Sequence, residues 1–184
     1  FNKSLFPNPS EIAKFLHSHN VRLGLEIDPT EGLYPHETYY KEACSYLGIN
    51  DNKIIVFDPL NPKLLDVYFK LFLHPLEALG VDFFWHDYTG DKQALKLLAY
   101  NHYNYKDMGR NPAKRSIMLS RSGVFAAHRY PILYAGSTEV SWEGLREISA
   151  SNMAASNIGV SFWSHDVGGN HGGIEESELY IRYV

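Results

Sequence analysis

The stretch from Gly80 to Asp91, GVDFFWHDYTGD, determines how the rest of the chain is interpreted. Val81 and the run Phe83 to Trp85 lack the alternation of a half-exposed strand, which is typical of a strand buried between helices in a parallel sheet. The run ends near Asp87, whose burial is costly unless the carboxylate has a partner. Because α/β barrels place their chemistry at the carboxyl ends of strands, Asp87 is a candidate catalytic residue. A second role, in which Asp87 only caps the turn at Gly90, stays open on this evidence.

Helical and strand patterns alternate along the whole chain. Strands are predicted at 21–27, 81–85, 116–121, 131–136 and 160–166, with a short extended piece at 54–57. Helices are predicted at 8–20, 35–47, 61–79, 92–108, 142–156 and 175–184, and Pro75 is expected to kink the third of them near residues 71–74. This alternation indicates an α/β fold with a parallel sheet.

Five long strands are fewer than the eight of a closed (β/α)₈ TIM barrel, whose typical length is about 250 residues. The chain of 184 residues is therefore either an open doubly wound sheet or the middle of a barrel. The abrupt start and the unfinished last helix favour the barrel, with residues 1–184 as part of one catalytic domain.

Composition narrows the class of partner. A net charge of -4 without a cluster of Lys and Arg argues against nucleic-acid binding. No stretch reaches the roughly 18 apolar residues of a membrane span, so no membrane partner is expected. Cys44 is the single cysteine and can form neither an internal disulfide nor a thiolate metal site. The compartment stays open between cytoplasmic and secreted.

Functional side chains follow four of the predicted strands, and three aromatic residues lie near them. Carboxylates and arginine bind hydroxyl groups, while aromatic faces cover the apolar side of a sugar ring. If the strands are neighbours in one parallel sheet, their ends meet at one edge and favour a site for a polyhydroxylated ring. The residues are Asp87, Arg121, Ser137 and Asp166, with Trp85, Tyr134 and Trp163.

Three blocks of the sequence resemble glycoside hydrolase family 31, the retaining α-glucosidase and α-xylosidase family. They are GVDFFWHDYTG (80–90), LSRSGVFAAHRYPILYAGSTEVSWEGL (119–145) and SNIGVSFWSHDVGGNHGGIEESELYIRYV (156–184). The opening residues 1–37 are similar to the segment that precedes these blocks in bacterial members. The resemblance implies a (β/α)₈ barrel of which this chain contains about the third to the seventh strand.

The resemblance also implies roles for individual residues. Asp87 matches the catalytic nucleophile, preceded by a sugar-contacting aromatic position at Trp85, and Arg121 matches an arginine that binds a sugar hydroxyl. Asp166 matches the aspartate that holds the sugar at the end of the seventh strand. The remaining substrate-binding candidates are Asn170 and His171 in the adjoining loop, Tyr134 where many members have Trp, and Trp163.

Ser137 departs from the family pattern. The family has an aspartate there as general acid/base, and the separation of sixteen residues from Arg121 matches the family's. Retaining hydrolysis needs two carboxyl groups about 5 Å apart, and a serine hydroxyl is too weak an acid to replace one of them.

Three interpretations of Ser137 stay open. The chain is an altered glycosidase whose acid/base was removed to trap substrate, a natural variant in which Glu139 reaches back into the site, or a sugar-binding relative without turnover. For Glu139, a solvated carboxylate at a helix start is the alternative.

We therefore expect a retaining α-glycosidase that hydrolyses or transfers α-glycosidic bonds of oligosaccharides through a glycosyl-enzyme on Asp87. A catalytically silent carbohydrate-binding relative is the alternative. The expected partners are an oligosaccharide or glycoside and the rest of the barrel, and no cofactor is implied.

Other polar residues have simpler interpretations. His86, His165 and His171 lie near Asp87 and Asp166 and suggest a metal only weakly, because no His-x₃-His pair is present. Asp82, His128-Arg129-Tyr130 and the glycine-rich loop 168–173 are expected to be structural. Asp28 and Glu31 are candidates for outer substrate contacts or for turn formation beside Pro29.

Overall fold

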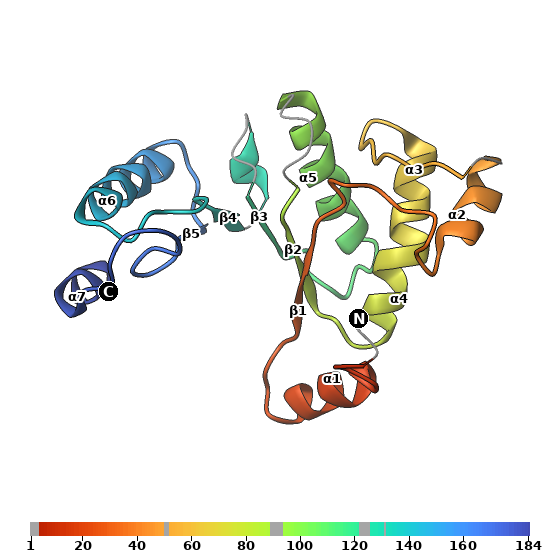
Figure 1. Ribbon diagram of the computed structural model, residues 1–184, viewed down its shortest axis with the longest axis horizontal. Coiled ribbons are helices and arrows are strands. Elements are labelled where there is room, and N and C mark those ends of the chain that lie inside the picture. Colours follow the sequence, from red (N-terminus) through yellow and green to blue (C-terminus); the bar gives the residue numbers. More distant parts are fainter. Residues whose placement is uncertain (1–3, 50–51, 89–93, 122–125, 131) are drawn as a thin grey trace.

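Five short parallel strands form one open sheet in the order β1-β2-β3-β4-β5 (Figure 1). The computed structural model describes residues 4–49, 52–88, 94–121, 126–130 and 132–184. The strands are β1 (Gly24–Ile27), β2 (Phe83–His86), β3 (Met118–Ser120), β4 (Ile132–Tyr134) and β5 (Trp163–Ser164). A doubly wound sheet reverses its strand order at a switch point, whereas this order is sequential, as in a barrel. The predicted partial barrel is therefore confirmed.

Helices connect the strands and cover their outer side. Figure 1 shows α3, α4 and α5 gathered beside β1 and β2, with α6 and α7 near β4 and β5. No helix in the described part of the chain combines the length and the apolar character that crossing a membrane would require. The helical elements are α1 (Pro9–Ser18), α2 (Tyr40–Leu47), α3 (Pro62–Val67), η1 (Tyr68–Leu73), α4 (His74–Ala78), α5 (Ala94–Met108), η2 (Ala127–Arg129), α6 (Trp142–Asn157) and α7 (Ser177–Tyr183).

The predicted helix 61–79 is divided by a π-helical turn. Asn61 caps its start, because its side chain accepts hydrogen bonds from the backbone N–H groups of Lys63 and Leu64. The π turn η1 ends directly before α4, which contains Pro75. Proline has no N–H and its ring clashes with the carbonyl four residues earlier, so a change in hydrogen-bond register just before Pro75 relieves that conflict.

Several element bounds differ from those predicted. The strands are shorter than their apolar runs, and the extended piece 54–57 contributes only an antiparallel bridge between Leu33 and Ile55. The helix predicted from residue 35 begins at Tyr40, because residues 34–39 form turns in which the Glu37 carboxylate accepts from the Tyr34 N–H at 2.6 Å. Residues 92, 93 and 131, predicted to begin a helix and a strand, lie outside the described residues.

The main hydrophobic core lies between the sheet and the helices that follow β1 and β2. Phe84 and Met118 are fully buried in it together with Tyr100 of α5 and Leu73 of η1. Burial alternates along β2, since Phe84 and His86 are buried while Phe83 and Trp85 on the other face are partly exposed, so the described chain buries only one face of this predicted two-sided strand completely.

Asp82 lies at the opposite end of β2 from Asp87 and has the structural role expected of it. Its carboxylate accepts from the Leu23 N–H at 2.8 Å and contacts His17 Nε2 at 2.7 Å and Arg22 at 3.2 Å. Burial acts to raise the pKa of Asp82, but these partners outweigh it and the pKa is lowered.

Candidate active site

The register between β2 and β3 places Asp87 and Arg121 on the same face of the sheet. Trp85 pairs with Leu119, so the side chains of these two residues share a face. Asp87 and Arg121 each follow two positions later, and alternation returns them to that face. The backbone pairing also extends past the strands, since Asp87 N–H donates to Ile27 O at 3.0 Å and Arg121 N–H to His86 O at 3.3 Å.

The same rule places Tyr134 and Asp166 on this face and Trp163 on the other. Ile132 pairs with Leu119, which puts Tyr134 in line with Arg121, and Tyr134 pairs with Ser164, two residues before Asp166. Trp163 instead donates from Nε1 to Asn152 Oδ1 of α6 at 2.7 Å and packs on the core beneath that helix. The structure therefore does not bring Trp163 together with the other predicted sugar-binding residues.

Asp87 and Arg121 form an ion pair, with 2.8 Å between Asp87 Oδ1 and Arg121 Nε. Both side chains are mostly buried, yet neither of these two atoms has a hydrogen-bond partner with acceptable geometry among the described residues. Opposite charge therefore holds these two side chains together. The guanidinium thus gives the Asp87 carboxylate a partner of opposite charge at the end of its strand.

Two aromatic rings stand beside this ion pair. The ring of Tyr134 lies 5.6 Å from Arg121 Cζ, and the Trp85 and Tyr134 rings meet edge to face at 5.6 Å between centroids. The indole Nε1 of Trp85 is buried and has no hydrogen-bond partner in the described chain. The rim of the sheet thus places the ion pair beside two aromatic rings.

The Tyr134 hydroxyl joins Asp166 and Asn170. It donates to Asp166 Oδ2 and accepts from Asn170 Nδ2 at 3.2 Å. Burial, followed by the hydrogen bond and the charge of Asp166, raises the pKa of Tyr134 to about 12, while Arg121 and a hydrogen bond with Ser137 act in the opposite direction. The phenol is therefore protonated at any pH where glycosides are normally processed.

Two loops that follow β4 and β5 pair with each other like short strands. Asn170 N–H donates to Thr138 O at 2.9 Å, and Asn170 Oδ1 accepts from Thr138 N–H at 3.0 Å. Val140 N–H donates to His171 O at 3.0 Å, although the side chain of His171 itself is exposed. We call residues 138–140 with 170–171 the loop ladder, and it fixes the segment next to Ser137 against the loop next to Asp166.

Ser137 is exposed and lies beside Tyr134, at the end of β4 where the general acid would be expected. Gly136 precedes it with φ of +95°, a left-handed conformation that interrupts the alternation of the strand. Glu139 is also exposed, and its side chain lies beside Gly172. The side chain of Glu139 is thus at the loop ladder, and no hydrogen bond or ion pair among the described residues joins it to Asp87 or Tyr134.

Sequence reasoning missed a buried chain of side chains behind Asp87. His86 is completely buried, its Nδ1 lies 3.0 Å from the Tyr100 hydroxyl, and that hydroxyl lies 3.1 Å from the Tyr68 hydroxyl. Burial lowers the pKa of His86 to about 3, so its imidazole is neutral near pH 7. In the sequence, His86 stands alone at the end of an apolar run. That pattern suggests burial but does not show that Tyr100 and Tyr68 are its partners.

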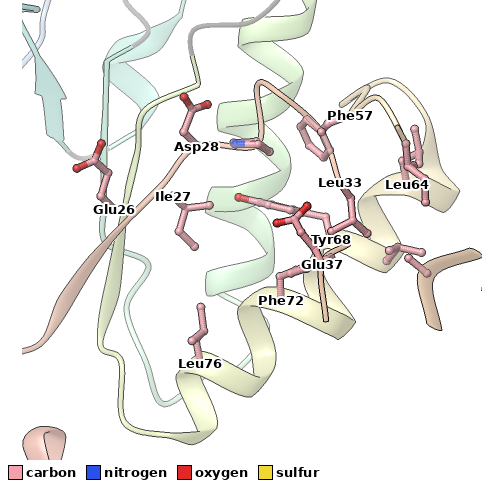
Figure 2. Close-up of a pocket in the computed structure, with 15 residues that line it drawn as sticks. Glu26, Ile27, Asp28, Leu33, Glu37, Phe57, Leu64, Tyr68, Phe72 and Leu76 are labelled. Carbon is pink, nitrogen blue, oxygen red and sulfur yellow. The ribbon is translucent and has the colours of Figure 1, made fainter. Parts of the chain in front are cut away.

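Asp28 directly follows β1, and the pairing of Ile27 with His86 puts it in line with Asp87. Asp28 Oδ1 accepts from the Thr30 backbone N–H at 2.9 Å, which is the turn chemistry considered for it. A pocket of about 290 Å³ lies here. Figure 2 shows that its lining combines apolar side chains such as Ile27 and Leu76 with the carboxylates of Asp28 and Glu37. Asp28, the candidate for an outer substrate contact, lines this pocket, whereas Asp87, Arg121, Tyr134 and Asp166 do not.

A metal centre finds no support in the described residues, among which no three His, Cys, Asp or Glu side chains gather closely enough to hold an ion. The histidines considered as ligands are separated. His86 is buried against Tyr100, His165 Nδ1 lies 3.4 Å from the Asp166 carbonyl, and His171 is exposed.

Known proteins resemble this chain over nearly its whole length. The model of the glycosyl hydrolases family 31 TIM-barrel domain matches residues 1–184. An alpha-xylosidase of Saccharolobus solfataricus is 22% identical over 99% of the chain, and human neutral alpha-glucosidase C is 24% identical over 100% of it. These matches span only 28% and 24% of the two relatives.

Among solved structures, the cycloalternan-degrading enzyme from Trueperella pyogenes superimposes with a TM-score of 0.77 at 19% identity. The overlap covers 96% of this chain and 30% of that enzyme, and at this identity it shows the fold alone. The family match over the full chain, together with the sequential parallel sheet, shows that the chain belongs to glycosyl hydrolases family 31 and forms part of its TIM-barrel domain.

Proposed function

We propose that this chain provides the nucleophile side of a retaining α-glycosidase site, with Asp87 as nucleophile and Ser137 in the place of the general acid/base. The ion pair between Asp87 Oδ1 and Arg121 Nε, 2.8 Å apart at the rim of the sheet, is the observation that supports it most directly. Trp85 and Tyr134 supply ring faces, and Asp166 supplies a carboxylate for a sugar hydroxyl.

The first chemical step requires little from Ser137 when the leaving group is a weak base. An Asp87 oxygen attacks the anomeric carbon and forms an ester, and the bond from that carbon to the leaving oxygen breaks. An activated phenolate departs as the anion, whereas a sugar alkoxide needs a proton that Ser137 cannot donate. Loss of general acid catalysis typically lowers the rate by about 10²- to 10⁴-fold.

The second step is slow for the same reason. Water must lose a proton as it attacks the ester, and a serine hydroxyl is too weak a base to accept it. A small anion such as azide needs no deprotonation, so it releases the sugar as the glycosyl azide. Accumulation of the ester and its release by azide are the expected properties of this site.

The test is the reaction of the complete barrel with 2,4-dinitrophenyl α-glucoside and α-xyloside, followed by mass spectrometry of the intact protein and of its peptides. We expect a glycosyl ester on Asp87 and faster turnover when azide is added. The matched control is Asp82→Asn, which removes a carboxylate at the other end of β2 and leaves the ester-forming site intact. An ester on another residue would refute the assignment of Asp87.

The competing function is that of a carbohydrate-binding relative without turnover. The exposure of Ser137 and the position of Glu139 beside Gly172 favour it, because neither residue supplies an acid at the rim. Sugar binding with no ester under any condition, with or without azide, would support this function.

A further inference from the structure

Tyr134 occupies the centre of the proposed site, and its hydroxyl has a defined direction of hydrogen bonding. The side chain is 5% exposed. Asn170 Nδ2 can only donate and an ionised Asp166 carboxylate can only accept, so the single proton of the Tyr134 hydroxyl must point to Asp166.

The orientation of the Asn170 amide is fixed in turn. Its Oδ1 accepts from the Thr138 backbone N–H at 3.0 Å, and this leaves Nδ2 facing Tyr134. The bonds therefore run in one direction, from the Thr138 N–H to Asn170, from Asn170 to Tyr134, and from Tyr134 to Asp166 Oδ2. Thr138 is the residue next to Ser137, so this relay joins the acid/base position to the carboxylate proposed to hold the sugar.

We propose that Tyr134 is a positioning residue that acts through its hydroxyl, orienting Asp166 for the sugar and linking it through Asn170 to the segment that contains Ser137. This inference rests on the proposed function of the site as a sugar site. Because the Tyr134 hydroxyl occupies Asp166 Oδ2, a sugar hydroxyl is received chiefly by Oδ1. The aromatic ring has a separate role against Trp85 and Arg121, which a phenylalanine would retain.

The variant that isolates the hydroxyl is Tyr134→Phe in the complete barrel. Loss of a hydrogen bond to a charged group corresponds to about a tenfold or larger change in binding. For 4-nitrophenyl α-glucoside and α-xyloside we expect KM to rise about tenfold, while the rate of ester formation at saturation changes less than about threefold, because the lost interaction serves ground state and transition state alike.

A double-mutant cycle tests whether Tyr134 acts through Asp166. Asp166→Asn should weaken binding at least as much as Tyr134→Phe, and adding Tyr134→Phe to it should weaken binding little further. The matched control is Tyr40→Phe, which removes the hydroxyl of a buried tyrosine in α2 that donates to the Lys53 carbonyl oxygen. That variant should leave KM unchanged.

A measurement without any sugar completes the test. In Tyr134→Phe, hydrogen exchange at the Thr138 amide should become at least about tenfold faster, since Asn170 loses the partner that orients it. The Gly144 amide, which donates to Ser141 Oγ at 3.0 Å outside the relay, should be unaffected.

The outcomes separate this inference from the proposed function. Unchanged exchange at Thr138, or additive effects of Tyr134→Phe and Asp166→Asn on sugar binding, would overturn the relay. Faster exchange at Thr138 in a protein that forms no ester on Asp87 would support the relay and refute the glycosidase assignment.

Discussion

At the scale of single residues, Ser137 decides which reactions the proposed site can perform. Asp87 and Arg121 have the ion pairing that a nucleophile needs, and Tyr134 and Asp166 are joined at the same rim. A hydroxyl at position 137 leaves this arrangement without its second carboxyl group. If the proposed roles hold, the site favours substrates whose leaving group departs without a proton.

The sequence predicted which residues lie at the strand ends but not how they pair. Asp87 and Arg121 were expected at one rim because each follows a strand, and the register confirms that they share a face. The bond from Tyr134 to Asp166 and the position of Trp163 against α6 depend on which face each residue occupies. A shift of one residue in the strand register moves every side chain to the opposite face of the sheet. Strand bounds predicted only to within two or three residues therefore could not assign each side chain to a face.

His86 yields a prediction about acid sensitivity. Its pKa is lowered to about 3 by burial, from 6.5, so below pH 6.5 the unfolded chain binds a proton that the folded chain does not. Stability contributed by the neutral ring is complete above pH 6.5 and falls by about 1.4 kcal/mol per pH unit as the pH is lowered toward 3.

The test compares the wild type with His86→Gln, which keeps polar atoms near Tyr100 and cannot titrate. Urea unfolding gives the free energy of unfolding of each protein at pH 7.5 and at pH 5.5. Between these two pH values the wild type should lose about 1 kcal/mol more than His86→Gln does. Equal losses for the two proteins would show that His86 is protonated in the folded state or does not contribute.

At the scale of elements, the loop ladder depends on glycines that approach the opposite loop closely. Gly173 has φ of +64°, and a Cβ there would lie 1.8 Å from the Val140 carbonyl oxygen. Gly48 at the end of α2 has a similar φ of +71° but has no atom within 4 Å of the corresponding position. Substituting alanine at Gly48 therefore introduces backbone strain alone, whereas the same substitution at Gly173 adds a steric clash to that strain.

We predict that Gly48→Ala costs about 1–2 kcal/mol, the cost of a left-handed alanine. Gly173→Ala should cost more, because the ladder must separate as well, and should also raise KM for aryl glycosides by disturbing Asn170 and Tyr134. Thermal unfolding and steady-state kinetics check both variants. Equal destabilisation by the two substitutions, with unchanged KM for Gly173→Ala, would contradict a role of the ladder in the site.

The elements themselves were largely predictable from the sequence. Apolar runs and glycine or proline boundaries identified all five strands. Pro75 predicted an irregularity near residues 71–74, and the structure has a π turn at Tyr68–Leu73 there rather than a simple proline kink. The length of each strand was not predictable. Only the part of an apolar run that lies next to a neighbouring strand can form sheet hydrogen bonds, and the sequence of one run does not show where that part begins and ends. The turn at residues 34–39 replaced helix because Glu37 bonds the Tyr34 backbone instead.

At the scale of the whole molecule, the described strands form an open sheet with β1 and β5 at its edges. The chain spans 24% to 30% of the length of the compared relatives, so the rest of a barrel would cover these edges in a complete enzyme. Uncovered strand edges template association with other chains.

We predict that a polypeptide of residues 1–184 alone self-associates at micromolar concentration, whereas the complete barrel remains monodisperse. Light scattering after gel filtration measures this, and urea unfolding of the isolated polypeptide should be less cooperative. A monomeric, cooperatively unfolding polypeptide would mean that the five strands are stable without their barrel neighbours.

Parallel strands bring Asp87, Arg121 and Asp166 to the rim where Ser137 stands, and the proposed glycosidase site depends on this whole arrangement. The most direct measurement is kcat/KM of Ser137→Asp in the complete barrel on maltose and on methyl α-xyloside, which have poor leaving groups. We predict a gain of at least about tenfold on one of them, the lower end of general acid catalysis, with little change on dinitrophenyl glycosides. A folded Ser137→Asp variant that shows no gain on either substrate would contradict the account.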